Sequence, residues 1–306
     1  MSGLVFLFPG QGSQAVGMGR DLCARFPAAA ELFAQADDLL NLPLSQCCFE
    51  GPEEELRQTA VTQPALFVHS IAACRLLQDR GIRPSWVAGH SLGEYSALVA
   101  AGVFDFAAGL QLVRRRGQLM QEQRQGSMAA VLGLEDQQVI DLCAQVPGVV
   151  AANFNAPGQV VISGEVEAVL RAGKLAEAAG AKRVVELPVS GAFHSPLMAP
   201  AALELADLLQ GMEFRTPQVP VLTNVAAVPV SDPHQLQQQL IDQMTSPVRW
   251  TAIMQCLVGL GVESALEVGP GSVLRGLARR AAPQVKVAGA GTAEEIAALG
   301  GGQKDD

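Results

Sequence analysis

The stretch Gly89-His90-Ser91-Leu92-Gly93 decides how this chain folds locally, because it is a G-x-S-x-G sequence between a predicted strand and a predicted helix. Trp86-Val87-Ala88 is typical of the end of a buried strand. Residues 94–101 are typical of a helix, which Gly102 ends. A strand that turns abruptly into a helix lifts the hydroxyl of Ser91 out of the sheet and directs it toward the helix N-terminus. The stretch therefore predicts a nucleophile elbow, and the alternative is an ordinary glycine-rich turn.

The composition of the 306-residue chain is that of a globular protein, with 49% hydrophobic and 17% charged residues. Its length allows one large domain with an insertion, or two domains. A formal net charge of −9 argues against nucleic acid as the main partner. We see no leader sequence and no apolar run near the length of a membrane span, so we expect a cytoplasmic protein without membrane contact. The six cysteines have no metal-binding spacing, and we expect reduced thiols and no metal site.

The two ends of the chain predict one larger α/β unit. Leu4 to Phe8 is a continuous apolar run, typical of a strand covered on both faces. The loop at 9–14 lacks both the G-x-G-x-x-G pattern and the lysine of a P-loop, so we expect no nucleotide site there. The other expected elements are helices over 63–80 and 106–121, strands over 219–222 and 264–268, and a helix that runs through Arg280.

A smaller unit interrupts the larger one. Its predicted order is β-α-β-β-α-β, which is the ferredoxin-like pattern. The strands are expected over 128–132, 149–153, 160–163 and 183–189, and the helices over 136–145 and 166–179. We therefore divide the chain into a core of residues 1–126 and 196–299, a small subdomain of residues 127–195, and a glycine-rich tail, 300–306, that we expect to be disordered.

A serine hydroxyl becomes a nucleophile when a base takes its proton, and the chain has four histidines that could do so. His90 is adjacent to Ser91, and adjacent side chains in an elbow point apart. His69 lies inside a predicted helix, where a packed or surface histidine is the simpler interpretation. His234 lies in a first helical turn, where a solvated histidine is the simpler interpretation. His194 lies in a loop at the junction of the two units, which makes it the candidate base.

The third member of a Ser-His-Asp triad is not evident. Between the serine and the histidine lie five carboxylates that are as easily surface or capping residues: Asp105, Glu135, Asp136, Asp141 and Glu165. This absence counts against an ordinary α/β-hydrolase.

The run Arg114-Arg115-Arg116 suggests a site for an anion. At 100° per residue, Arg115 points away from the apolar stripe of its helix, as a solvated side chain does. An arginine at the edge of that stripe can instead present its planar guanidinium to a carboxylate. The geometry leaves the choice between Arg114 and Arg116 open.

Several motifs together resemble those of the malonyl-CoA:acyl-carrier-protein transacylases, almost from end to end. They are Phe8-Pro9-Gly10-Gln11-Gly12-Ser13-Gln14, Thr62-Gln63-Pro64-Ala65, Gly89-His90-Ser91-Leu92-Gly93-Glu94-Tyr95, Arg116-Gly117, residues 153–164, Gly191-Ala192-Phe193-His194-Ser195, Thr223-Asn224-Val225 and Glu267-Val268-Gly269-Pro270-Gly271. The resemblance implies an α/β fold with a hydrolase-like parallel-sheet core and an inserted ferredoxin-like subdomain. It also implies that Ser91 becomes malonylated, that His194 is its base, and that Arg116 binds the free malonyl carboxylate.

The resemblance implies roles for four further residues. The backbone N–H groups of Gln11 and Leu92 would form the oxyanion hole. The main-chain carbonyl of Gln243 would orient the histidine in place of the missing acid, giving a Ser-His dyad. Phe193 resembles the residue of malonyl-selective acyltransferases.

The implied substrates are malonyl-CoA and the phosphopantetheine thiol of acyl carrier protein in fatty-acid synthesis, with no cofactor and with a monomeric enzyme. Because carrier proteins are acidic, docking needs a local basic patch. The candidates, each also explained as plain surface charge, are Lys174, Lys182, Arg183, Arg275, Arg279 and Arg280. The competing hypotheses are the same chemistry in polyketide synthesis or malonate degradation, a serine thioesterase or hydrolase, and a non-catalytic carrier-binding protein.

Overall fold

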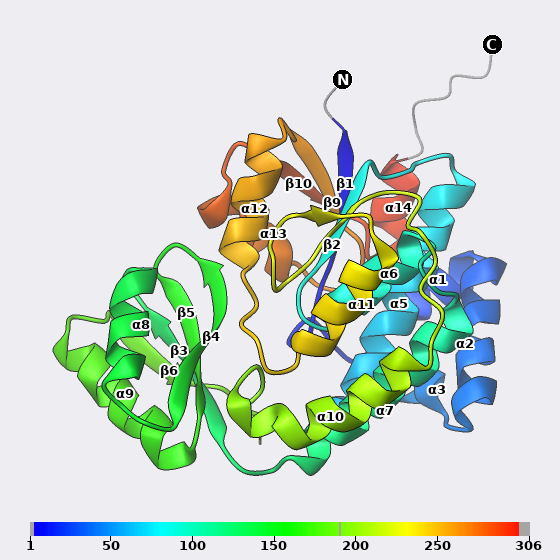
Figure 1. Ribbon diagram of the computed structural model, residues 1–306. Helices are drawn as coiled ribbons and strands as arrows, with labels where there is room; N and C mark the ends of the chain where they lie inside the picture. Colours follow the sequence, from blue (N-terminus) through cyan, green and yellow to red (C-terminus); the bar gives the residue numbers. More distant parts are fainter. Residues whose placement is uncertain (1–2, 190, 300–306) are drawn as a thin grey trace.

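The computed structural model describes residues 3–189 and 191–299, so the prediction of a disordered tail over 300–306 lies outside the described residues. Two units stand side by side (Figure 1). The larger has a six-stranded sheet in the order β10-β9-β1-β2-β7-β8, and the smaller a four-stranded sheet in the order β4-β5-β3-β6. The α/β fold predicted from the sequence is confirmed, while the residue boundaries of the two units stay predictions.

The central strand of the large sheet is the predicted β1 (Leu4–Phe8), which is parallel to both of its neighbours. The other strands are β2 (Trp86–Gly89), β7 (Val221–Leu222), β8 (Pro229–Val230), β9 (Ser264–Glu267) and β10 (Lys286–Gly289), with β8 antiparallel to β7. Phe6 and Phe8 pack into one core cluster, and Val5 and Leu7 into another on the opposite face. Burial on both faces explains why the strand is apolar throughout.

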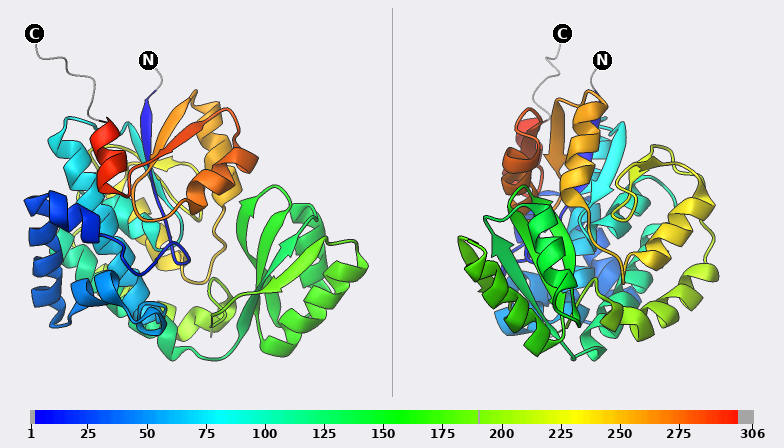
Figure 2. Two further views of the ribbon diagram at one scale, coloured as in Figure 1. Left: turned by 180° about the vertical axis from the view of Figure 1, so that it is seen from behind. Right: turned by 60° about the vertical axis from the view of Figure 1, so that its left-hand side comes forward.

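Helices cover both faces of this sheet (Figure 2). The residues of α12 (Trp250–Gly259) and α13 (Val273–Ala281) join the cluster of Val5 and Leu7, and those of α5 (Thr59–Asp79) join the cluster of Phe6 and Phe8. The remaining helices of this unit are α1 (Arg20–Arg25), α2 (Pro27–Leu40), α3 (Leu44–Glu50), α4 (Glu53–Leu56), α6 (Gly93–Ala100), α7 (Phe106–Glu122), the 3-10 turn η1 (Pro196–Met198), α10 (Ala199–Gln210), α11 (Pro233–Asp242) and α14 (Ala293–Leu299).

Helix α5 begins at Thr59, four residues before the predicted start, and contains Pro64. A proline inside a helix leaves the carbonyl four residues earlier without its N–H partner. Here that carbonyl belongs to Ala60, and it accepts a hydrogen bond from the guanidinium of Arg114 at 2.7 Å. The neighbouring helix α7 thus satisfies the group that the proline leaves free.

Among the described helices, α5 alone is long and apolar enough to cross a membrane, yet 89% of its most apolar window is buried inside the protein. It is a core helix of the larger unit.

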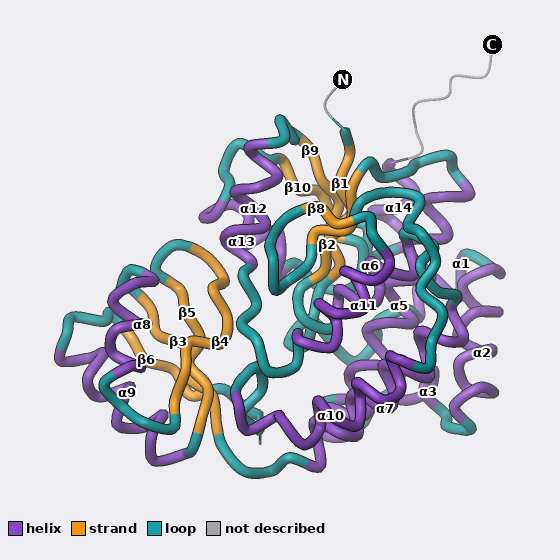
Figure 3. Tube along the Cα trace, viewed as in Figure 1, coloured by secondary structure: helices purple, strands orange, loops and turns teal. Residues whose placement is uncertain are grey.

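The small unit has the predicted β-α-β-β-α-β order in an antiparallel sheet. Its elements are β3 (Ser127–Leu132), α8 (Asp136–Ala144), β4 (Val149–Ala156), β5 (Gln159–Gly164), α9 (Val166–Ala178) and β6 (Arg183–Glu186). Both helices lie on the face of the sheet that points away from the larger unit (Figure 3). The open face of the sheet therefore borders the larger unit.

Three predicted strands differ from the structure by two or more residues at one end. β4 continues through Asn155 and Ala156, with two register shifts in its pairing with β5. β6 ends at Glu186 and does not reach 189, and β7 begins only at Val221. Pro188 and Pro220 have no N–H to donate to a ladder, which explains both shortened strands.

Candidate active site

Ser91 stands in the turn between β2 and α6, as the sequence predicts. Its backbone has φ = 49°, in the left-handed region that side chains other than glycine rarely adopt. A Cβ at Gly89 would lie 1.9 Å from the carbonyl carbon of Gly93, and a Cβ at Gly93 would lie 2.0 Å from the carbonyl oxygen of Phe8. Only glycine fits at either position, so the two glycines make the elbow possible.

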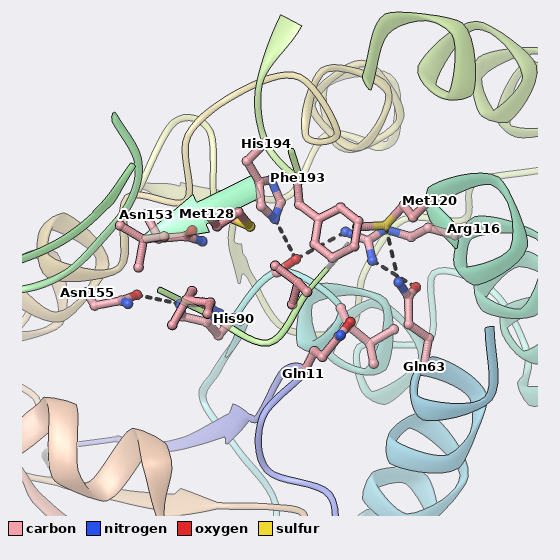
Figure 4. A pocket seen from close by; sticks show the side chains of 15 residues that line it. Gln11, Gln63, His90, Arg116, Met120, Met128, Asn153, Asn155, Phe193 and His194 are labelled. Carbon is pink, nitrogen blue, oxygen red and sulfur yellow. Dashed lines mark hydrogen bonds between the residues drawn. The ribbon is translucent and has the colours of Figure 1, made fainter. Parts of the chain in front are cut away.

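His194 lies in the loop between β6 and η1, beside Phe193 in the pocket (Figure 4), and its imidazole contacts the hydroxyl of Ser91. Its Nε2 is 2.8 Å from Ser91 Oγ, and its Nδ1 is 3.0 Å from the main-chain carbonyl oxygen of Gln243. A carbonyl only accepts, so Nδ1 carries the proton and Nε2 is free to accept the serine proton. The pKa of His194 is lowered to about 3, first by burial and then by the positive charge of Arg116, so the imidazole is neutral at neutral pH.

The other three histidines lie where the sequence places them, apart from the serine hydroxyl. His69 is 1% exposed inside α5, and burial lowers its pKa to about 4. His234 is exposed. His90 is directed away from Ser91, and its Nε2 donates to Asn155 Oδ1 of β4 at 2.7 Å, which links the two units.

No carboxylate completes a triad among the described residues. Asp105 caps α7 by accepting from the N–H of Ala108, and Glu135 caps α8. The Gln243 carbonyl occupies the position next to Nδ1 that an acid would take.

The three consecutive arginines have three different environments. Arg114 donates to Ala60, as described above, and the half-buried Arg115 is paired with Glu204 at 2.7 Å. Arg116 is 1% exposed, and its Nη2 donates to Ser91 Oγ at 3.1 Å. Of the three, Arg116 alone donates to the serine hydroxyl, which favours it over Arg114 as the residue that binds an anion.

The guanidinium of Arg116 is held from several sides. It donates to the side-chain oxygens of Gln63 at 2.8 Å and Gln243 at 3.0 Å, and lies 5.1 Å from the ring centre of Tyr95. Its buried Nε has no hydrogen-bond partner, and it enters no salt bridge among the described residues. A buried cation with no carboxylate in direct contact is suited to binding an anionic group.

A cavity of about 150 Å³ opens at these residues, between the two units. Gln11, from the loop after β1, and Leu92 line it together with Phe193. Leu92 directly precedes α6, so its N–H is one of the orphan donors of a helix N-terminus. The small unit adds Met128, Asn153, Asn155 and Val161 (Figure 4). The site can thus hold a small group with one negative charge next to the serine.

Sequence reasoning assigned no role to three buried polar residues beside the site, Gln63, Glu94 and Asn224. Each lies in a motif quoted above, but its partners are far away in sequence. Asn224 Oδ1, for example, accepts from the N–H of Ser91 at 2.7 Å across 133 positions. The available signal was Glu94, the one charged residue of the helix Gly93–Ala100.

The fold and this site define a serine-dependent acyl transferase. The model of the acyl transferase domain family matches residues 5–305, and the chain belongs to this family. The resemblance stated from the motifs is thereby confirmed, and the protein is an acyltransferase enzyme.

Within the family the chain is similar to one group of enzymes throughout its length. It is 44% identical over 303 residues to the malonyl CoA-acyl carrier protein transacylase of Bacillus subtilis (strain 168), covering 97% of this chain and 96% of that protein. Its structure matches an acyl carrier protein S-malonyltransferase from Vibrio cholerae with a TM-score of 0.94 and 46% identity, over 97% and 99% of the two chains. A malonyl-transacylase solved in complex with its type II PKS acyl-carrier protein also gives a TM-score of 0.94, with 44% identity over 97% and 98% of the chains.

Proposed function

We propose that this enzyme transfers the malonyl group from malonyl-CoA to the phosphopantetheine thiol of acyl carrier protein, through a malonyl ester on Ser91. The observation that carries the proposal is one hydroxyl between two groups: His194 Nε2 is 2.8 Å and Arg116 Nη2 is 3.1 Å from Ser91 Oγ. The names of the relatives support the same substrates, including the carrier protein of the solved complex. The pathway it serves is fatty-acid synthesis, with polyketide synthesis and malonate degradation as alternatives.

The first half-reaction loads the serine. Ser91 Oγ attacks the thioester carbonyl carbon while its proton moves to His194 Nε2. The tetrahedral intermediate collapses, the carbon–sulfur bond breaks, and the proton passes from His194 to the departing CoA sulfur. In the second half-reaction the carrier thiol gives its proton to His194 and attacks the acyl carbonyl, and Ser91 leaves with that proton.

The oxyanion that forms in both steps needs donors at the serine. We assign the backbone N–H groups of Gln11 and Leu92 to this role, since both residues line the cavity and Leu92 begins a helix. Loss of one such donor slows an enzyme on the order of 10²–10³-fold.

Arg116 is assigned to the malonyl carboxylate. Its unpartnered Nε and the absence of a direct salt bridge to any described residue support a bound anion. Because the charge of Arg116 lowers the pKa of His194, a bound carboxylate that offsets this charge makes His194 a stronger base. An acetyl group offers no such offset, so selectivity and base strength are coupled.

The carrier protein would dock on exposed basic residues near the junction of the units. Lys182 and Arg280 line a surface cavity of about 320 Å³ there. Arg275 is occupied by Glu267 and Glu295, and Arg280 donates to Gln159. The candidates that are exposed and enter neither a salt bridge nor a side-chain hydrogen bond of the described residues are Lys174, Lys182, Arg183 and Arg279.

The reaction proposed requires no cofactor, since serine, histidine and backbone donors supply its chemistry. We further propose a cytoplasmic monomer, by analogy with the family and without a membrane or nucleic-acid partner.

The decisive experiment incubates the enzyme with malonyl-CoA, with and without holo carrier protein. A transacylase gains about 86 Da on Ser91, one malonyl group, and then releases it to the carrier. A thioesterase or hydrolase would give free malonate instead, and a non-catalytic binding protein would give no adduct. Ser91→Ala is the control, and an adduct on that variant would contradict the assignment.

A further inference from the structure

Glu94 is a buried carboxylate that the mechanism above does not use. It lies in the first turn of α6, three residues after Ser91, and is 1% exposed. One oxygen, Oε2, accepts two hydrogen bonds, from the side-chain nitrogen of Gln243 at 2.8 Å and from the backbone N–H of Asn224 at 3.0 Å. A buried carboxylate is costly unless it is hydrogen-bonded, and these two donors stabilise its ionised form.

Gln243 connects Glu94 to the base and to Arg116. Its side-chain oxygen accepts from Arg116 at 3.0 Å, while its side-chain nitrogen donates to Glu94 and to the carbonyl of Ser91 at 3.1 Å. A cation on one side and a carboxylate on the other fix which end of the amide faces which group. With the side chain fixed, the main-chain carbonyl of Gln243 stays 3.0 Å from His194 Nδ1.

Asn224 connects Glu94 to the elbow. While its backbone N–H donates to Glu94, its side chain accepts from the N–H of Ser91 at 2.7 Å and donates to the carbonyl of Gly89 at 2.6 Å. These bonds satisfy the backbone groups on both sides of His90, immediately before the left-handed Ser91. One carboxylate oxygen is thus shared by the two residues that hold the histidine and the serine.

We propose that Glu94 is a positioning residue for acyl transfer, whose ionised carboxylate holds Gln243 and Asn224 and, through them, sets the geometry between Ser91 and His194. The proposal rests on the proposed function, because it concerns the rate at which Ser91 becomes malonylated.

The protonation state of Glu94 gives this role a pH dependence. Burial raises its pKa to about 7, against the opposing effects of its two hydrogen bonds and of Arg116 on α7. The other titratable groups nearby are Tyr95 on the same helix, which is neutral at this pH, and His194 in the facing loop, which is neutral down to a much lower pH. Malonylation therefore slows as the pH falls through about 7 and Glu94 loses its charge.

The test measures single-turnover malonylation of Ser91 by mass spectrometry, above and below pH 7, in the full-length enzyme. Glu94→Gln keeps the shape and an acceptor oxygen but removes the charge. We expect its rate above pH 7 to fall roughly tenfold, because charge-assisted hydrogen bonds are about twice as strong as neutral ones. We also expect the slope near pH 7 to disappear. Glu94→Leu removes both bonds and should lose roughly a hundredfold, as small displacements at a reacting centre do.

Glu267→Gln is the matched control. Glu267 is also fully buried with a raised pKa, but it accepts from the backbone of Leu274 and Arg275 at the start of α13, away from the serine. This variant should lose stability and keep both the malonylation rate and its pH dependence. If Glu94 had only a structural role, Glu94→Gln would likewise lose stability while it kept the malonylation rate and its pH dependence.

The proposal is overturned if folded Glu94→Gln malonylates Ser91 at the wild-type rate, or if it keeps the slope near pH 7. Should Glu94→Leu fail to fold, the Gln variant alone decides. Wild-type enzyme that forms no malonyl-serine would contradict the proposed function instead, so the two failures are distinguishable.

Discussion

His194 Nδ1 lies 3.0 Å from the main-chain carbonyl oxygen of Gln243, where a Ser-His-Asp triad has a carboxylate. A neutral carbonyl orients the imidazole and fixes its tautomer, but it offers no charge to stabilise the imidazolium. The bound form of the substrate and the oxyanion donors must therefore supply more of the electrostatic stabilisation than they do beside a triad.

This relationship predicts that His194 titrates far below an ordinary histidine. Its pKa is lowered to about 3 by burial and by Arg116, so the imidazole should be neutral, with its proton on Nδ1, at about pH 6. Nitrogen-15 NMR of the ring nitrogens measures both properties. Arg116→Ala removes the nearby positive charge and should raise the pKa. A protonated His194 at about pH 6 in the wild type would contradict the prediction.

Arg116→Ala should retain malonylation of Ser91 but lose preference for malonyl over acetyl thioesters. Two charge-assisted hydrogen bonds to the carboxylate are at stake, which corresponds to roughly a hundredfold or more in the ratio of kcat/KM values. Competition between malonyl-CoA and acetyl-CoA measures that ratio. Arg115→Ala, on the adjacent arginine that is paired with Glu204, is the control and should keep the wild-type ratio. Equal preference in both variants would remove Arg116 from this role.

Gly93→Ala should unfold or severely destabilise the protein. Its Cβ would lie 2.0 Å from the carbonyl oxygen of Phe8 in the central strand, and backbone cannot move aside cheaply. We expect a loss of roughly 3 kcal/mol or more in the free energy of unfolding, measured by urea denaturation. At Gly276 in α13 a Cβ meets no atom within 4 Å, so Gly276→Ala should be neutral or stabilising by up to about 1 kcal/mol. Similar losses in both variants would refute the steric argument.

His69 should make the protein less stable in acid. Its pKa is lowered from 6.5 to about 4 in the folded state, so the unfolded state binds more protons as the pH falls through this range. Its contribution to stability is complete above about pH 6.5 and decreases by about 3 kcal/mol as the pH approaches 4. Denaturation of His69→Gln at several pH values should show a correspondingly weaker dependence. The exposed His234→Gln should match the wild type, and a wild-type pH dependence in His69→Gln would be the opposing result.

Charge reversal at Lys182 and Arg279 should slow malonyl transfer to the carrier protein, most strongly at low salt, because long-range attraction to an acidic partner is screened by ions. Malonylation of Ser91 from malonyl-CoA should continue in the double variant. Arg83→Glu provides the comparison, since Arg83 is exposed before β2, at the opposite end of that strand from Ser91. Carrier kinetics that match those of Arg83→Glu would exclude the two residues.

Sequence patterns predicted the elements whose conformation depends on neighbouring residues in the chain. The apolar run of β1 and the glycines of the elbow restrict the backbone directly, and both are found where expected. Helices α1, α3 and α4 went unpredicted because six, seven and four residues are too few to establish a helical period. Helix α2 could have been found, since it begins with Pro27 and ends before the left-handed Asn41.

The site was predictable only in part, for the same reason. The spacing of motifs identified Ser91 and His194 as candidates, but it did not distinguish Arg114 from Arg116. The role of Arg114 depends on Pro64 and Ala60, which lie in another helix. The charge of Glu94 in the first turn of a helix was a signal, but its partner Gln243 is 149 positions away and could not be identified from the sequence. Contacts of this range are set by how the helices and loops pack around the sheet.

The guanidinium of Arg114 donates to the carbonyl that Pro64 leaves free. The three consecutive arginines at 114–116 therefore meet three unrelated structural requirements. A saturation scan across 114–116 should give a thermolability phenotype at the first position, tolerance at the second, and altered substrate choice at the third. An alignment or a redesign that treats the three arginines as interchangeable cationic sites would miss the difference between their roles.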